Sequence, residues 1–217
     1  LRYLAPFGNA ISPFLERQYF LERPGLRIRP EPGETALDFG AGAGDTSLAF
    51  AAAVGAEGRV LACEPTPSEL VLQARNVAAN PDLAPRITPV AAAVSDRAGQ
   101  EIFLAGETTH AHIAPDGTSD GERAITTTID AMVTDHGLTR LDFIKLDIEG
   151  MELPALQGAA QSLPRFRPKL AICIYHGWQI FDVLPWVRDT LRDYSLHLET
   201  HSPIGAETVL YAQPKPR

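Results

Sequence analysis

A turn with three alternating glycines is the feature that most constrains how this chain can fold. The run DFGAGAGDTS, residues 38–47, joins an apolar strand-like segment to a helical pattern. Glycine has no Cβ, so Gly40, Gly42 and Gly44 let the backbone adopt positive φ and lie against a ligand. The dinucleotide fingerprint G-x-G-x-x-G would place its third glycine at Asp45, so the spacing disfavours NAD. We predict a different nucleotide-cofactor turn, with a merely tight connection as the alternative.

Short apolar runs alternate with helical patterns along most of the chain. The expected strands are residues 35–39, 59–63, 87–94, 141–146 and 169–174. The expected helices are residues 45–54, 68–80, 129–136, 149–158 and 178–192. Repeated β-α-β units imply a mostly parallel sheet with right-handed crossovers and helices on both faces, so we predict an α/β, Rossmann-like fold. Residues 196–200 and 208–211 are expected to form an antiparallel edge pair.

The length and composition fit one domain with a substantial core. The chain has 217 residues, of which 45% are hydrophobic, and we expect a single domain over residues 33–217. Residues 1–32 are rich in proline and aromatic side chains and are expected to form an N-terminal arm or lid. A hairpin-like insertion at residues 100–105 leads into the aperiodic polar loop 106–122. We expect this loop and the arm to cover the acceptor site.

Charge and cysteine usage limit the expected partners and location. The net charge of −8 offers no cationic surface, which disfavours nucleic acid and favours a small-molecule partner. No apolar run approaches the ~18 residues that a membrane helix needs, so membrane insertion is not expected. Cys63 and Cys173 lie in apolar strand-like runs, which is typical of reduced, buried thiols and favours a cytoplasmic location. A homo-oligomer is left open.

Polar residues follow the second and third expected strands, where ligands of open α/β sheets bind. Glu64 can accept hydrogen bonds from both ribose hydroxyls of an adenosine, although a solvated surface glutamate is the alternative. Ser95 and Asp96 are placed to meet an adenine edge, or they form an ordinary turn before Gly99. These residues therefore extend the predicted cofactor site across the sheet.

The run FIKLDIEGME, residues 143–152, combines a buried strand with several charges. Side chains alternate along a strand, so Lys145 and Asp147 share one face. A buried lysine needs a carboxylate partner, and we expect Asp147, Glu149 or Glu152 to supply it. The two glutamates also suit the first turn of a helix, where the dipole favours anions. Asp147 is harder than the glutamates to explain as purely structural, because it lies at the strand end.

Histidines follow two of the later strands. His176 comes after strand 169–174 and His201 after strand 196–200. His176 and Asp147 would suit an acid-base pair, or Asp147 and His201 would suit a divalent metal. His110 and His112 lie in the polar loop, where we favour solvated side chains over a metal site.

The motifs in their order resemble the FkbM family of S-adenosylmethionine-dependent methyltransferases over residues 33–213. They are DFGAGAGDTS, GRVLACEPTPSELVLQARNVAAN, AAAVSDRAGQ, TTTIDAM, LDFIKLDIEGMELPALQGA, RPKLAICIYH and ETVLYA. The resemblance implies a class I methyltransferase fold, with a seven-stranded sheet that has one antiparallel strand near its edge. It implies that Asp38, Gly40 and Gly44 hold the methionine end of S-adenosylmethionine. Gly42 departs from the family, whose loop often has asparagine there.

The predicted site combines these residues and the resemblance. We assign cofactor binding to Asp38, Gly40, Gly42, Gly44, Thr46, Glu64, Ser95, Asp96 and Asp147. We assign catalysis to Asp147, His176, Glu149 and Lys145. O-methylation of a hydroxyl on a small molecule or sugar is favoured, with His176 or Asp147 as base. An N-methyltransferase and a non-catalytic S-adenosylmethionine-binding domain are the alternatives, and a divalent metal is a further candidate cofactor.

Overall fold

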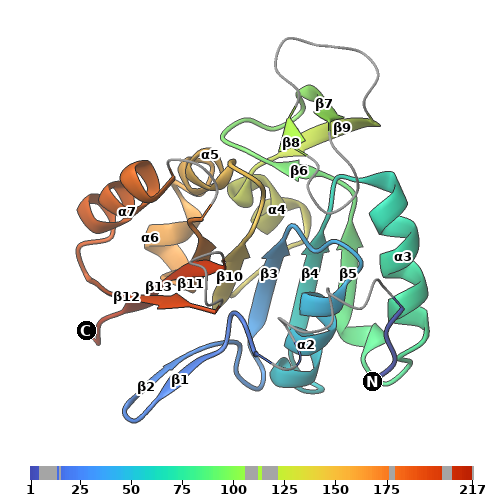
Figure 1. The fold of residues 1–217 in the computed structure, drawn as a ribbon, viewed down its shortest axis with the longest axis horizontal. Helices are drawn as coiled ribbons and strands as arrows, with labels where there is room; N and C mark the ends of the chain where they lie inside the picture. The colour runs from blue at the N-terminus through green and yellow to red at the C-terminus, as the bar shows by residue number, and fades with distance from the viewer. Residues whose placement is uncertain are drawn as a thin grey trace.

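The computed structural model describes residues 1–4, 14, 16–105, 112–113, 122–175, 179–201 and 207–216. Its main element is a seven-stranded sheet in the order β12-β13-β11-β10-β3-β4-β5 (Figure 1). The strands are β3 (Thr35–Phe39), β4 (Arg59–Cys63), β5 (Ile87–Val90), β10 (Phe143–Leu146), β11 (Lys169–Cys173), β12 (Tyr194–Thr200) and β13 (Thr208–Pro214). The strands β11, β10, β3, β4 and β5 pair in parallel, each with the next in this order. Strand β13 runs antiparallel to both β11 and β12. The predicted α/β sheet with an antiparallel edge pair is confirmed.

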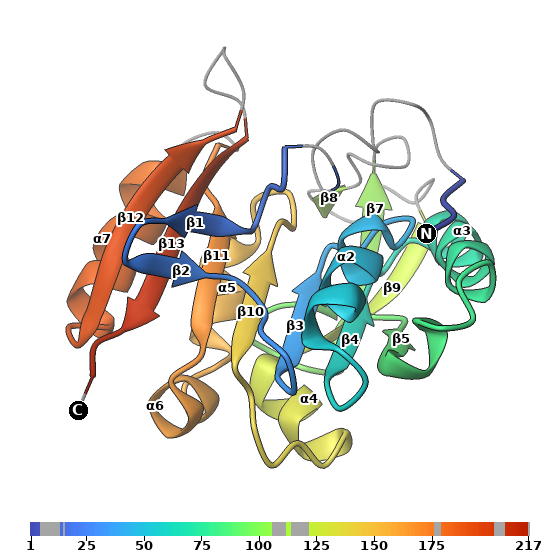
Figure 2. The same cartoon turned by 90° about the horizontal axis from the view of Figure 1, so that it is seen from below.

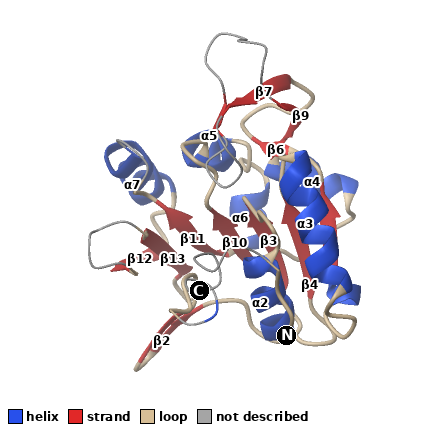
Figure 3. Cartoon of the chain, turned by 45° about the vertical axis from the view of Figure 1, so that its right-hand side comes forward, coloured by secondary structure: helices blue, strands red, loops and turns tan. Residues whose placement is uncertain are grey.

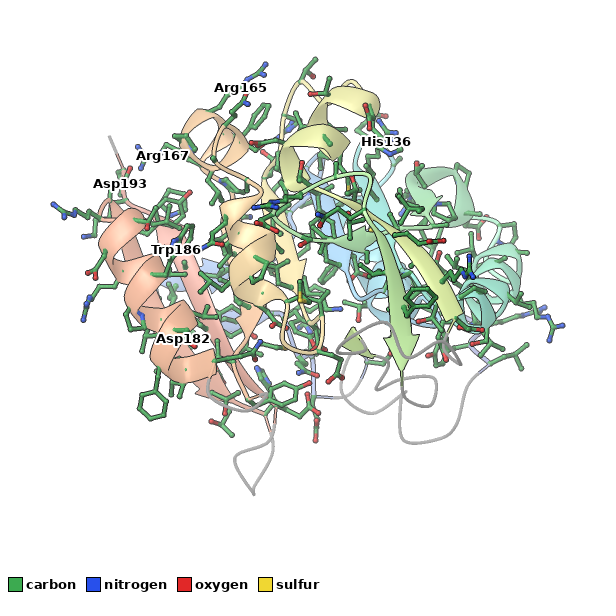
Figure 4. The ribbon with its side chains drawn as sticks, turned by 90° about the horizontal axis from the view of Figure 1, so that it is seen from above. His136, Arg165, Arg167, Asp182, Trp186 and Asp193 are labelled. Carbon is green, nitrogen blue, oxygen red and sulfur yellow. The ribbon has the colours of Figure 1, made fainter. Side chains whose placement is uncertain are left out.

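Helices and buried apolar residues lie on both faces of this sheet. The helices are α2 (Asp45–Val54), α3 (Pro67–Ala78), α4 (Ile129–Asp135), α5 (Glu152–Gln157), α6 (Ser162–Phe166) and α7 (Gln179–Thr190). One core contains buried residues of α4, α5, α6 and α7, and the other contains those of α2. Along β3, Leu37 and Phe39 enter the first core and Ala36 enters the second, as strand alternation requires. An ion pair of 2.8 Å between Arg167 and Asp193 ties the end of α6 to the start of β12 (Figure 4).

A second sheet differs from the expected single hairpin. It has the order β6-β9-β7-β8, with β6 (Ala93–Val94), β7 (Glu101–Ala105), β8 (His112–Ile113) and β9 (Glu122–Thr127). The predicted strand 87–94 is confirmed only over Ile87–Val90, which is β5. The chain then turns, where Ala92 N–H bonds the Val90 carbonyl, and residues 93–94 join the second sheet as β6. The second sheet lies beyond the carboxyl ends of β3, β4 and β5 (Figures 1 and 3). The insertion therefore lies at the edge that was expected to bind ligands.

The described parts of the N-terminal arm pack against the domain. The arm contains a short hairpin of β1 (Leu21–Arg23) and β2 (Leu26–Ile28), which lies on the same face as α2 (Figure 2). Tyr19, Leu21 and Ile28 are buried in the α2-side core. Main-chain groups of Arg2 and Leu4 bond side-chain amides on and just beyond α3. Residues 16–20 form a bend and a turn. The role of the arm as a lid stays a prediction.

None of the helices within the described ranges has the length and apolar character needed to span a bilayer. Both cysteines are buried free thiols, as the sequence predicted.

Candidate active site

The glycine turn follows β3 and is packed tightly at both ends. Gly40, Gly42 and Gly44 all have positive φ, at 76°, 47° and 87°. A Cβ on Gly40 would lie 1.8 Å from the Asp147 carbonyl oxygen, and one on Gly44 would lie 3.0 Å from Cγ of Gln73. Within the described ranges, a Cβ on Gly42 would meet only a Glu69 carboxylate oxygen, at 3.9 Å. The turn therefore requires glycine twice for packing, and the described residues leave the most room at Gly42.

Glu64 joins the glycine turn to the end of β4. Its Oε2 accepts the Gly42 N–H at 2.8 Å and its Oε1 accepts the Thr66 N–H at 2.9 Å. The residue is buried, with an exposed fraction of 6%. Each carboxylate oxygen has two lone pairs, so both oxygens retain the capacity to accept a further hydrogen bond. The sequence-predicted pair of glycine turn and strand-end acid is therefore brought together.

Further carboxylates surround the same turn. Glu69, in the first turn of α3, is buried, and burial followed by the Glu64 charge raises its pKa. Asp45 begins α2, and burial raises its pKa to about 6. Asp45 Oδ1 accepts the N–H of Thr46 at 2.9 Å. Thr46 lies in the first turn of α2, and its side chain is buried. The turn is thus lined by acids.

Lys145 pairs with Asp38, and the predicted partners Asp147, Glu149 and Glu152 are wrong. The two residues lie directly opposite on β10 and β3, and their charges are 3.1 Å apart. Lys145 Nζ also donates to the carbonyls of Phe39, at 3.1 Å, and Gly40, at 2.7 Å. The ammonium therefore has two hydrogen-bond acceptors beside its paired charge. Burial acts to lower the pKa of Lys145, but the Asp38 and Asp147 charges outweigh it and hold the pKa raised.

This ion pair supports the glycine turn from within the core. The Asp38 side chain is fully buried, and its Oδ2 accepts a hydrogen bond from Ser47 Oγ at 2.5 Å. The charged groups of Asp38 and Lys145 therefore contact other groups of the protein itself. Both side chains are placed to hold the end of β3 in position. Sequence alternation predicted the correct face for Lys145 but not the strand across from it.

Asp147, just after β10, accepts hydrogen bonds from two tyrosines that sequence reasoning missed. Tyr19 OH donates to Oδ2 at 2.7 Å and Tyr175 OH donates to Oδ1 at 3.2 Å. Burial first, and then the Asp147 charge, raises the pKa of both phenols well above the ordinary value, so both stay protonated donors. Tyr175 follows β11 at the same sheet edge, which is a signal that the sequence contains. No sequence pattern pointed to Tyr19.

The predicted start of the helix at Glu149 is wrong, because α5 begins at Glu152. Glu149 has a φ of 53° and is followed by Gly150 at 106°, so this segment is a turn. The Glu152 carboxylate accepts the N–H groups of Ile148, at 2.9 Å, and Gly150, at 3.1 Å, together with the side-chain amide of Gln179. Glu152 is fully buried, and burial raises its pKa to about 7. Glu152 therefore shapes the turn that carries Glu149.

Ser95 and Asp96 lie where β6 ends. Ser95 is buried, and its Oγ donates to Asp96 Oδ1 at 3.1 Å. The Ser95 N–H donates to the Thr127 carbonyl at 2.9 Å, which anchors the segment to β9. The Asp96 side chain is 42% exposed and lies 3.7 Å from Arg97. Their contact with adenine stays a prediction.

The structure describes only some of the histidines that the sequence singled out. His176 and His110 lie outside the described residues, and His112 is described only as part of β8. His201 Nε2 is 3.0 Å from Tyr211 OH, and burial lowers the pKa of this imidazole. Over the described ranges, no three His, Cys, Asp or Glu side chains are grouped to hold a metal ion. The divalent metal therefore stays untested.

The sheet order, the reversed β13 and the glycine turn after β3 define the class I methyltransferase fold. A family model described as methyltransferase FkbM domain matches residues 38–196. The chain belongs to the FkbM methyltransferase family. A search of curated proteins found no match.

Solved structures agree with this assignment. A methyltransferase FkbM from Methylobacillus flagellatus KT is 26% identical with a TM-score of 0.69, over 90% of this chain and 47% of that one. This chain therefore spans about half the length of that protein. The fold alone is shared with Aeropyrum pernix fibrillarin in complex with S-adenosyl-L-methionine (12% identity, TM-score 0.56, 90% and 71% covered). The same holds for an S-adenosylmethionine-dependent O-methyltransferase from Thermotoga maritima (13%, 0.53, 100% and 68%).

Proposed function

We propose that this chain is an S-adenosylmethionine-dependent methyltransferase that methylates a hydroxyl of a small molecule or sugar. The acid-lined glycine turn is the observation that most strongly supports this choice of cofactor. Glu64 accepts the Gly42 N–H, Glu69 lies 3.9 Å from the position of a Cβ on Gly42, and Asp45 follows the turn at the start of α2. S-adenosylmethionine brings a sulfonium and an ammonium, which such a field attracts, whereas it would repel the pyrophosphate of NAD. Membership of the FkbM family supports the same conclusion.

The residues present fit this cofactor. Glu64 retains lone pairs for ribose hydroxyls beside the backbone of Gly42. Ser95 and Asp96 are the candidates for the adenine, and Asp38 with Lys145 keeps the turn in place from the core. When bound, S-adenosylmethionine supplies a methyl group already activated by the sulfonium.

The remaining task of the protein is to align the acceptor and remove its proton. Proximity and orientation supply about 7–11 kcal/mol at best. A hydroxyl also needs a base, and we assign this role to His176 or Asp147. Asp147 has both oxygens occupied by phenol donors but retains lone pairs, so it is able to accept the hydroxyl hydrogen. Glu149, on the turn that Glu152 shapes, is a second carboxylate close in sequence to this strand end.

The experiment that tests this function has two parts. Calorimetry compares S-adenosylmethionine with NAD, and we expect only the former to bind. Mass spectrometry then follows transfer of a deuterated methyl group to a panel of sugar, lipid-linked and polyketide-type alcohols and to matched amines. Product from alcohols supports O-methylation, product from amines alone would establish N-methylation, and cofactor binding without product across the panel would favour the non-catalytic alternative.

The base is tested by His176→Ala. We expect kcat to fall ~10²–10⁴-fold with cofactor affinity nearly intact. A variant with unchanged kcat would exclude His176 as the base. Loss of activity in EDTA that a divalent ion reverses would assign the removal of the proton to a metal.

A further inference from the structure

Tyr19 is held in a backbone conformation that aromatic residues rarely adopt. Its φ is +74°, in the left-handed region where a Cβ is unfavourable. Its side chain is nevertheless buried, with 3% exposed, and its ring packs edge-on against Phe50 with centroids 6.5 Å apart. The Tyr19 N–H donates to Tyr211 OH at 3.1 Å, and that hydroxyl is also 3.0 Å from His201 Nε2. Such conformations persist only where the surroundings determine them, and they concentrate at functional sites.

The phenol of Tyr19 has one hydrogen, and the geometry shows where it goes. The hydroxyl oxygen is 2.7 Å from Asp147 Oδ2 and 3.4 Å from Cys173 Sγ. A carboxylate only accepts, so the Tyr19 hydrogen goes to Asp147, and the thiol donates to the phenol oxygen. Lys145 Nζ lies 5.3 Å from the centroid of the Tyr19 ring, which places a cation over its face. Tyr19 is therefore fixed from several sides.

We propose that Tyr19 is a positioning residue of the active site, which fixes the orientation of the Asp147 carboxylate. This inference rests on the proposed function for the role of Asp147. The bond from Tyr19 is 2.7 Å, against 3.2 Å from Tyr175, so Tyr19 makes the shorter of the two contacts. With one donor on each oxygen, the carboxylate cannot rotate freely, and its remaining lone pairs keep one direction. Tyr19, a residue of the N-terminal arm, thereby becomes part of the candidate active site.

The first test follows the Asp147 carboxyl directly and needs no acceptor. In protein labelled with [4-13C]aspartate, the Asp147 signal is the one that Asp147→Asn removes. We expect Tyr19→Phe to shift and broaden this signal at pH 7, because the carboxylate loses one donor and samples more orientations. Tyr194→Phe is the matched control, since Tyr194 is buried on β12 and its hydroxyl has no hydrogen-bond partner in the described parts of the chain. We expect it to leave the Asp147 signal in place.

Tyr211→Phe guards against loss of folding in Tyr19→Phe. It leaves the Tyr19 phenol in place but removes the hydroxyl that holds its backbone. We expect a smaller shift of the same Asp147 signal. A signal that stays at its wild-type position in either folded variant would overturn the proposal.

The second test separates positioning from simple stabilisation. With an alcohol that yields product, we expect Tyr19→Phe to lower kcat roughly 10–100-fold. The dissociation constant of S-adenosylhomocysteine should stay within about twofold, and adding Tyr19→Phe to Asp147→Asn should lower kcat no further. Independent, additive losses would refute the proposal. Wild-type protein that fails to bind S-adenosylhomocysteine would instead refute the proposed function, and the carbon signal would still decide the contact between Tyr19 and Asp147.

Discussion

Gly42→Ala should separate the packing role of the glycine turn from its role in binding. Gly42 has a φ of +47°, and alanine in the left-handed region costs about 1–2 kcal/mol. The lower entropy of the unfolded chain returns about 0.4–1 kcal/mol. Among the described residues, no atom would be nearer to the new Cβ than the Glu69 oxygen at 3.9 Å, so these residues add no steric cost. We therefore expect a net loss of only about 1 kcal/mol in the free energy of unfolding.

Cofactor affinity should respond far more than stability. A methyl group would fill the open face at Gly42, beside the N–H that bonds Glu64. We expect S-adenosylhomocysteine to bind at least ~10-fold more weakly, which corresponds to about 1.4 kcal/mol. Calorimetry measures the affinity, and urea unfolding measures the stability.

A matched control isolates the conformational cost. Gly25, in the turn between β1 and β2, has a φ of +77°, and a Cβ added there would have no atom of a described residue within 4 Å. Gly25→Ala should therefore lose similar stability and no affinity. Gly40→Ala should fail to fold, because its Cβ would meet the Asp147 carbonyl. If Gly42→Ala binds S-adenosylhomocysteine as well as Gly25→Ala does, the cofactor does not approach this face and the reasoning fails.

Three other substitutions test the surrounding residues. Glu64→Ala should weaken cofactor binding by ~1.5–3 kcal/mol, the worth of charge-assisted hydrogen bonds, and unchanged calorimetric affinity in a folded variant would remove the ribose assignment. Lys145→Met leaves the Asp38 charge buried and unpaired, so urea unfolding should show a loss of about 3–5 kcal/mol, whereas a loss below about 1 kcal/mol would contradict the ion pair. Burial raises the pKa of Glu152 from 4.5 to about 7, so the folded state holds a proton that the unfolded state releases, and stability should fall as pH rises through this interval. Glu152→Gln should flatten that slope, and Tm profiles from about pH 5 to 8 that stay parallel would count against it.

The main sheet was predictable because its strands are buried on both faces and therefore appear as continuous apolar runs. Alternation also assigned Lys145 to the correct face of its strand. Its partner was not predictable, because Asp38 is opposite through strand register, and register between distant segments leaves no local pattern. The turn after Val90 was missed because the alanines that follow it are compatible both with a continued strand and with a turn. Glycine spacing, in contrast, marked the tight backbone at Gly40 because the steric requirement there is local.

The site residues divide in the same way. Glu64 was predictable from its place after a strand, and Tyr175 has the same signal. Tyr19 was not, because its position depends on a left-handed turn in an aperiodic segment and on contacts with residues far along the chain. Buried polar networks of this kind are specified by three-dimensional packing, and the sequence pattern around each member carries little of that information.

The bond between the Tyr19 N–H and the Tyr211 hydroxyl spans 192 positions, which has a consequence for synthesis on the ribosome. Tyr19 is translated long before β13, so for most of elongation it lacks the hydroxyl that holds its backbone. Contacts of such long range form late and slow folding. The sheet can assemble while Asp147 still lacks its Tyr19 donor. Nascent chains arrested before Tyr211 should therefore contain much of the fold but lack the ordered contact between Tyr19 and Asp147.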